Sequence, residues 1–159
     1  PCLDPALPAA IEAVRALGFE VGLHTGGSYP ARLKAVLPMV NWVGLDVKAV
    51  PEDETHWMNV VRVPGAQYKW SESLDALLAS GVPFECRSTV HPDYFSEAQI
   101  LVTGKALAKR GVSTYVLQIC RRPPGQLFSR FGSVLESWPS AETLETLKGL
   151  FEHFKVRRE

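Results

Sequence analysis

The chain has 159 residues, of which 46% are hydrophobic, and 17 basic and 17 acidic side chains give it a formal net charge of zero. This length is enough for one domain with a hydrophobic core and too short for two full ones. A neutral chain has no general electrostatic attraction to a nucleic-acid backbone or an anionic membrane, so a small ligand or a protein partner is the expected class of partner.

The predicted elements begin with a helix. Asp4 is a favourable N-cap and Pro5 a favourable first helical residue, and Gly18 is expected to end this helix. The stretch "FEVGLHTGG" (19–27) predicts a strand followed by a tight turn. "PARLKAVLPM" (30–39) predicts a short helix, and "VNWVGLDVK" (40–48) predicts the second strand.

The next segment, residues 50–70, shows no clear periodicity and is expected to be a long loop, which in a compact domain is usually functional or poorly ordered. Ser71 is predicted to cap a helix that ends at Gly81, and "PFECRSTV" (83–90) predicts the third strand. Ser96 and Gln99 have the spacing of a capping box, which opens a helix that runs to residue 111.

The last predicted elements are the strand "TYVLQIC" (114–120), an irregular stretch over 121–139 and a helix that starts at Ser140. This last helix is expected to bury Leu144, Leu147, Phe151 and Phe154.

The order is thus one helix followed by four strand–helix repeats. Alternation of this kind predicts an α/β fold with four parallel strands, five helices and right-handed crossovers. Because the chain starts with a helix, we expect a strand to precede it in a longer protein. The expected architecture is an incomplete (β/α) barrel, with 1–159 as a single domain, barrel units over 1–120, and a loop and C-terminal helix over 121–159.

Polar residues stand at the predicted carboxyl ends of these strands, where parallel α/β folds bind ligands. Asp46 and Lys48 are two positions apart on one strand and therefore share a face. Asp46 could accept a hydrogen bond from a ligand ammonium or ribose hydroxyl, and Lys48 could pair with a carboxylate. The alternative is a solvated strand end.

Three further strand ends carry candidates. The turn Thr25-Gly26-Gly27 offers a hydroxyl and backbone donors without bulky side chains, although a glycine pair is also ordinary turn chemistry. Arg87, within a buried strand, needs an anionic partner, which is either a ligand or Glu85 on the same face. His91 lies just beyond this strand and Gln118 on the last one; a loop histidine there is equally ordinary.

Together these residues suit a zwitterionic ligand that carries a ribose, and the familiar motifs GxSxG, HExxH, GxxxxGK[ST] and GxGxxG do not occur. The segments "LHTGG", "VGLDVKA", "ASGVPFECRSTVHP" and "YVLQ" resemble the radical S-adenosylmethionine (radical SAM) enzymes. Within them, the activating proteins of anaerobic ribonucleoside-triphosphate reductase and related glycyl-radical activases are the most similar. The resemblance covers residues 1 to about 120.

This resemblance implies a partial TIM-like (β/α)₆ barrel, S-adenosylmethionine and a [4Fe–4S] cluster as cofactors, and a glycyl-radical reductase subunit as partner. A cytoplasmic location is expected from the sequence itself, which shows neither an apolar run of the roughly 20 residues that span a bilayer nor a basic-then-apolar leader. It places Thr25, Gly26 and Gly27 at the turn near the ribose and methionine of the cofactor. It makes Asp46 and Lys48 an acidic and basic pair at the cofactor, and Arg87 a cofactor-facing arginine.

The family binds its cluster through a CxxxCxxC loop, which does not occur in this sequence. Cys2, Cys86 and Cys120 are too far apart in the sequence to replace it, and each is most simply a small buried residue. We therefore expect the C-terminal portion of an activase, without a cluster and inactive by itself. The alternatives are a module that docks or binds a ligand without catalysis, and an unrelated complete α/β enzyme with Asp46 and Lys48 as acid and base.

Overall fold

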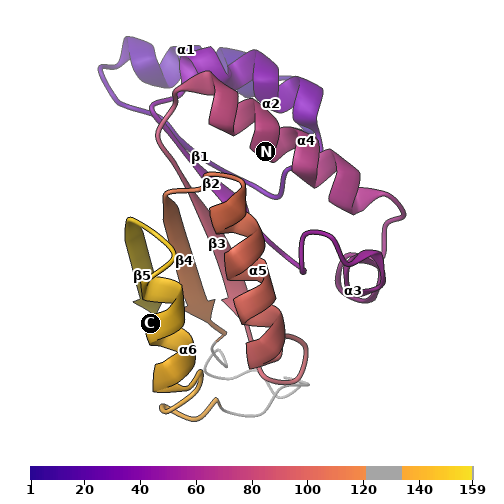
Figure 1. The fold of residues 1–159 in the computed structure, drawn as a ribbon. Coiled ribbons are helices and arrows are strands. Elements are labelled where there is room, and N and C mark those ends of the chain that lie inside the picture. Colours follow the sequence, from indigo (N-terminus) through magenta and orange to yellow (C-terminus); the bar gives the residue numbers. More distant parts are fainter. Residues whose placement is uncertain (121–133, 159) are drawn as a thin grey trace, which may run out of the picture.

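The computed structural model describes residues 1–120 and 134–158, which build one parallel sheet with helices packed outside it (Figure 1). The strands are hydrogen-bonded in sequence order, and every pair is parallel. They are β1 (Gly22–Thr25), β2 (Trp42–Asp46), β3 (Phe84–Val90), β4 (Thr114–Ile119) and β5 (His153–Arg157). The α/β class and the parallel pairing expected from the sequence are confirmed, and the sheet has five strands where four were predicted.

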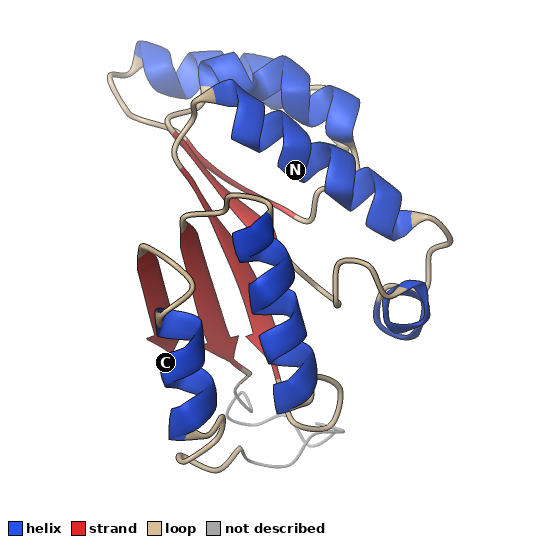
Figure 2. Ribbon diagram, in the orientation of Figure 1, coloured by secondary structure: helices blue, strands red, loops and turns tan. Residues whose placement is uncertain are grey.

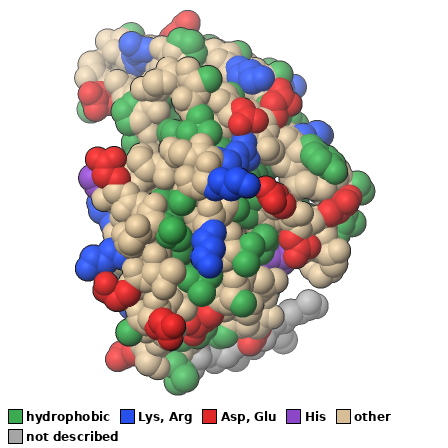
Figure 3. Space-filling model, viewed as in Figure 1, with side chains coloured by type: hydrophobic (Ala, Val, Ile, Leu, Met, Phe, Trp, Pro, Cys, Tyr) green, Lys and Arg blue, Asp and Glu red, His purple; other side chains and the backbone are tan. Residues whose placement is uncertain are grey.

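The helices follow the twist of the sheet (Figure 2): α2 and α4 run alongside β1 and β2, and α5 and α6 cover β3 to β5. On the face shown in Figure 3, acidic and basic side chains are interspersed. None of the helices in the described part of the chain is both long and apolar enough to cross a membrane. Their bounds are α1 (Leu7–Ala16), α2 (Pro30–Val36), the 3-10 helix η1 (Leu37–Met39), α3 (Glu54–Val60), α4 (Ala66–Ser80), α5 (Glu97–Lys109) and α6 (Ala141–Lys148).

The fifth strand takes the place of the end of the predicted last helix. Helix α6 starts after its Ser140 cap, as expected, but it ends at Lys148, and Phe154 lies on β5. The predicted number of five helices is also wrong, because α3 is a sixth α-helix in the described part of the chain. Phe151 and Phe154 are three residues apart, a spacing that suits a helix face. Here both rings instead pack on Tyr115 of β4, with centroids 5.1 and 6.1 Å away.

Three helix starts also differ from the prediction. Helix α1 starts at Leu7, because the Asp4 carboxylate accepts from the Ala6 amide in a turn that precedes it. Helix α3 lies in the predicted loop 50–70, with Asp53 as its N-cap. Helix α4 starts at Ala66 instead of Ser71, directly after Gly65, which has a φ of 71°. Of the irregular stretch predicted over 121–139, residues 121–133 lie outside the described residues.

The hydrophobic core lies between the sheet and the helices. Alternate strand residues point into it, so that Leu45, Cys86 and Leu117 are fully buried. The opposing helices contribute Leu33, Leu74, Ile100, Leu107 and Leu147, which are fully buried as well. The other residues of each strand lie on the opposite face, which is called the open face below; Val116 and Glu85 on this face are nevertheless buried.

Glu97 at the start of α5 connects this helix to α6. Its carboxylate accepts hydrogen bonds from the Ser140 hydroxyl at 2.5 Å, the Ser140 amide at 3.1 Å and the Thr143 hydroxyl at 2.6 Å. Burial raises the pKa of the Glu97 carboxyl, but these donated hydrogen bonds outweigh it, so the pKa is lowered. The carboxylate form therefore stabilises the packing of α5 against α6.

We expect Glu97→Gln to lower the free energy of unfolding at neutral pH by about 1.5–3 kcal/mol, the range for hydrogen bonds to a charged group. The folded-state pKa lies below the unfolded value of 4.5, so this contribution is complete above that pH and is lost as the pH falls through the folded-state pKa. Urea unfolding at several pH values measures it. Glu142→Gln, an exposed change in the first turn of α6, is the control, and equal losses in both variants would contradict the prediction.

Candidate ligand-binding site

The candidate site lies on the open face, at the carboxyl end of β2 and beside the middle of β3. Asp46 is in register with Arg87 on the neighbouring strand, so the two side chains lie next to each other. The Arg87 Nε donates to Asp46 Oδ1 at 2.6 Å, and the Lys48 ammonium donates to Asp46 Oδ2 at 3.1 Å. One carboxylate is thus bound by two cations, each through a different oxygen.

Burial decides how much these ion pairs contribute. The side chain of Arg87 is 18% exposed and that of Asp46 27%, whereas that of Lys48 is 48% exposed. The Arg87–Asp46 pair is therefore partly shielded from water and the Lys48–Asp46 pair largely hydrated. From the core side, the Trp70 indole Nε1 donates to the Asp46 carbonyl at 3.0 Å and fixes the end of β2.

The structure corrects the alternative partner of Arg87. Glu85, on the same strand, instead forms a two-pronged pair with Arg157 of β5, at 3.1 and 3.2 Å. Glu85 is buried and Arg157 is partly exposed, so this pair closes the open face over β4. The partner of Arg87 is Asp46, which is another member of the predicted site.

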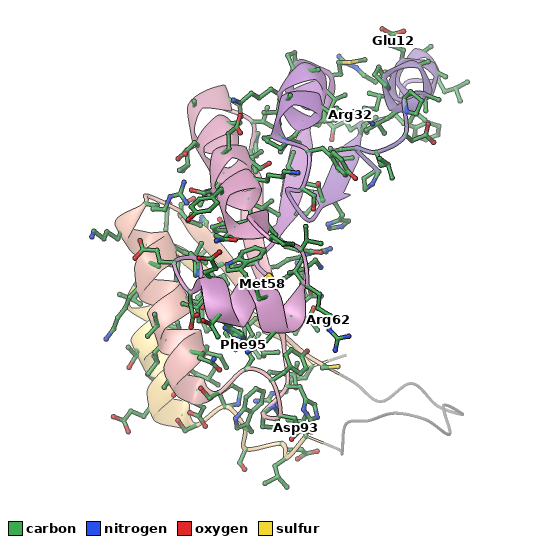
Figure 4. The ribbon with its side chains drawn as sticks, turned by 90° about the vertical axis from the view of Figure 1, so that its right-hand side faces the viewer. Glu12, Arg32, Met58, Arg62, Asp93 and Phe95 are labelled. Atoms are coloured by element: carbon green, nitrogen blue, oxygen red, sulfur yellow. The ribbon has the colours of Figure 1, made fainter. Side chains whose placement is uncertain are left out.

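A cavity of about 370 Å³ lies beside these charges, within the usual size range for small-ligand sites. Its strand-side lining is Asp46, Val47, Lys48, Arg87 and Thr89. The other walls are Asn59 and Val60 of α3, and Tyr94 from the turn after β3. In Figure 4, Met58 marks α3, Arg62 lies just after this helix, and Asp93 and Phe95 mark the turn after β3.

The predicted turn after β1 lies beside Lys48, and the Thr25 side chain in it points away from the candidate site. Thr25 is in register with Leu45, faces the core and is buried, and its hydroxyl accepts from the Gly27 amide at 3.2 Å. A Cβ on Gly26 would lie 3.4 Å from the Lys48 side chain, so this residue is next to the site. Gly27, with a φ of 72°, packs against Leu45 too closely for a Cβ without some displacement.

The remaining two predicted residues lie farther from the ion network. His91 is 3% exposed; its Nδ1 accepts from the Asp93 amide at 3.2 Å, and its ring stacks on Tyr94. Gln118 is partly exposed on the open face of β4, in register with Thr89, which lines the cavity. The structure therefore brings together Asp46, Lys48, Arg87 and Gly26, with Gln118 one strand away.

Three residues around the site were missed from the sequence. Asn59 belongs to a helix that the sequence did not indicate. Tyr94 donates from its hydroxyl to the Thr89 carbonyl at 3.3 Å, and burial, followed by Cys120, raises the pKa of its phenol. His24 lies on the open face, 3.5 Å from Arg87. Strand alternation places His24 on the opposite face from Thr25, but its position beside Gly44, two residues before Asp46, depends on the register of β1 and β2.

The cysteines do not form a site for an iron–sulfur cluster. Cys2 and Cys86 are buried and Cys120 is partly exposed, and in the described ranges no three His, Cys, Asp or Glu side chains gather at ligand distance. Burial raises the pKa of the Cys86 thiol, which disfavours the thiolate that a metal requires. The three cysteines therefore do not fit as ligands of the [4Fe–4S] cluster that the resemblance to radical SAM enzymes implies.

Neither the protein-family models nor the curated proteins with which the chain was compared give a match. A parallel sheet that places acidic and basic side chains beside a cavity near its carboxyl end is typical of α/β proteins that bind a small ligand.

Proposed function

We propose that this chain is the C-terminal, cofactor-binding part of a radical SAM glycyl-radical activase whose partner is the glycyl-radical subunit of anaerobic ribonucleotide reductase. The observation that carries the proposal is the network of Asp46, Lys48 and Arg87, which joins the carboxyl end of β2 to the adjacent parallel strand β3 beside a cavity. The sequential strand order supports it, because a barrel segment has this order and a doubly wound sheet does not.

The ligand chemistry follows from the side chains. Lys48 and Arg87 offer charged donors for the carboxylate of the methionine group, and on Arg87 this donor is Nη2, because Nε donates to Asp46 and Nη1 lies beside His24. Asp46 accepts from the ligand ammonium or a ribose hydroxyl. Each of the three side chains is ion-paired in the structure, and one carboxylate with two cations leaves the network with a net positive charge that favours an anionic ligand group.

In this family the bound cofactor supplies a 5′-deoxyadenosyl radical that takes a hydrogen atom from a glycine of the reductase subunit. The described cysteines do not fit the cluster that this chemistry needs, so we assign only cofactor binding and orientation to these residues. Direct acid–base use of Asp46 is the weaker function, because both of its oxygens already accept hydrogen bonds from cations.

The test has a genetic and a binding part. The gene upstream of the Pro1 codon is expected to encode an in-frame CxxxCxxC. The full-length gene product is then titrated calorimetrically with S-adenosylmethionine under anaerobic conditions, with ATP as a competing nucleotide. Binding of S-adenosylmethionine in preference to ATP is expected. A stop codon directly before Pro1, or a cluster-loaded product that does not bind S-adenosylmethionine, would overturn the proposal.

A further inference from the structure

His24 occupies a space on the open face that exists because residue 44 is a glycine. The two residues are in register on β1 and β2. A Cβ at position 44 would lie 2.4 Å from His24 Nδ1 and 2.9 Å from its Cε1, which is closer than side chains approach one another. Trp42 supports the imidazole edge-on, with ring centroids 5.1 Å apart. The His24 ring is thus held over the backbone of β2.

This position brings His24 Nε2 to 3.5 Å from the Nη1 of Arg87. A guanidinium can only donate hydrogen bonds, so Nε2 must be the acceptor and the proton of the neutral ring must lie on Nδ1. Arg87 then has two anchors, His24 at Nη1 and Asp46 at Nε. Because the guanidinium is planar, two anchors fix its plane and leave Nη2 for a further acceptor.

We propose that His24 is a positioning residue that orients Arg87 toward the carboxylate of the ligand, and that Gly44 leaves the space this requires. The ligand part rests on the proposed function, whereas the hydrogen bond between His24 and Arg87 does not. His24 is exposed and outside the core, so it contributes little to stability. Its loss changes ligand binding and leaves the fold intact.

The hydrogen bond is tested first without any ligand. The full-length gene product, labelled with ¹⁵N in its histidines, is studied by long-range proton–nitrogen NMR, and the His24 signals are assigned from their loss in His24→Gln. His24 is expected in the Nδ1-H form, and Arg87→Met is expected to abolish that preference. A ring with its proton on Nε2 in the parent protein would overturn the proposal.

The positioning role is tested by a double-mutant cycle on the affinity for S-adenosylmethionine. His24→Leu and Gly44→Ala are each expected to weaken binding about 3- to 10-fold, the equivalent of one ordinary hydrogen bond. The double variant is expected to be no weaker than either single one, because both remove the same contact. His24→Gln, whose amide oxygen can accept from Arg87, is expected to retain most of the affinity.

The matched glycine control is Gly22→Ala, also on the sheet, where the added Cβ would only touch Trp42 at 3.4 Å. It is expected to bind like the parent. Multiplying effects of His24→Leu and Gly44→Ala, or parent-like binding in both, would overturn the positioning role. A parent protein that does not bind S-adenosylmethionine would overturn the proposed function, whereas the NMR result tests the His24–Arg87 contact separately.

Discussion

Lys48→Met is expected to weaken S-adenosylmethionine binding by roughly 10- to 100-fold and to leave the stability of the protein almost unchanged. The loss in affinity corresponds to one hydrogen bond to a charged group, about 1.5–3 kcal/mol. The stability is retained because the Lys48–Asp46 pair is largely hydrated and contributes at most about 1 kcal/mol. Asp46 keeps Arg87 as its partner in this variant. Calorimetric titration and urea unfolding of the full-length product measure both quantities.

Asp46→Asn removes the carboxylate that both Lys48 and Arg87 contact. It is expected to weaken binding as much as Lys48→Met and also to destabilise the fold by about 1–3 kcal/mol, because the less exposed Arg87 loses its carboxylate. Lys34→Met is the control, since it removes an exposed surface pair with Glu72 away from the cavity. Parent-like binding in both Asp46→Asn and Lys48→Met would mean that these residues are a solvated strand end.

Loss of folding in both variants would have a different meaning. It would show that the charges are structural partners of Arg87, and the assignment of Asp46 and Lys48 to a cofactor would then be withdrawn.

Much of the fold was predictable because local signals and the final packing agree. The Ser96–Gln99 capping box forms as expected, and Ser140 caps α6. The sequence was insufficient at β5, where Phe151 and Phe154 fit a helix face as well as a strand that packs on Tyr115. Such a segment becomes a strand because β4 offers its edge, which is a tertiary effect.

Because β5 was not predicted from the sequence, the alternative partner expected for Arg87 at the site was wrong as well. Without β5, Glu85 had no visible partner other than Arg87, two residues away on the same face. The register instead places Asp46 next to Arg87 and leaves Glu85 to Arg157. Strand alternation predicted correctly that Asp46 and Lys48 are neighbours, although β2 ends at Asp46 and Lys48 lies two residues beyond it. Contacts between strands depend on register, which the sequence alone does not determine.

Trp70→Ala is expected to have the largest effect on stability, a loss of about 3–5 kcal/mol in the free energy of unfolding. Trp70 is 1% exposed, and its ring packs on Trp57 with centroids 5.8 Å apart. The change removes this packing together with the hydrogen bond to the Asp46 carbonyl. A domain is typically stable by about 5–15 kcal/mol, so the loss is a large share of the total. Tyr68→Ala, exposed on the same helix, is the control and is expected to stay within about 0.5 kcal/mol of the parent.

Trp70→Phe tests whether this core residue also supports the site. Phenylalanine fills most of the space but has no N–H group, so the Asp46 carbonyl loses its donor and the end of β2 is less firmly held. We expect a loss of about 1–3 kcal/mol in stability, the cost of leaving a partly buried acceptor without its donor. Affinity for S-adenosylmethionine, measured where both proteins are fully folded, is expected to fall as well. Parent-like affinity in Trp70→Phe would show that the position of Asp46 depends on its pair with Arg87 and not on the core beneath it.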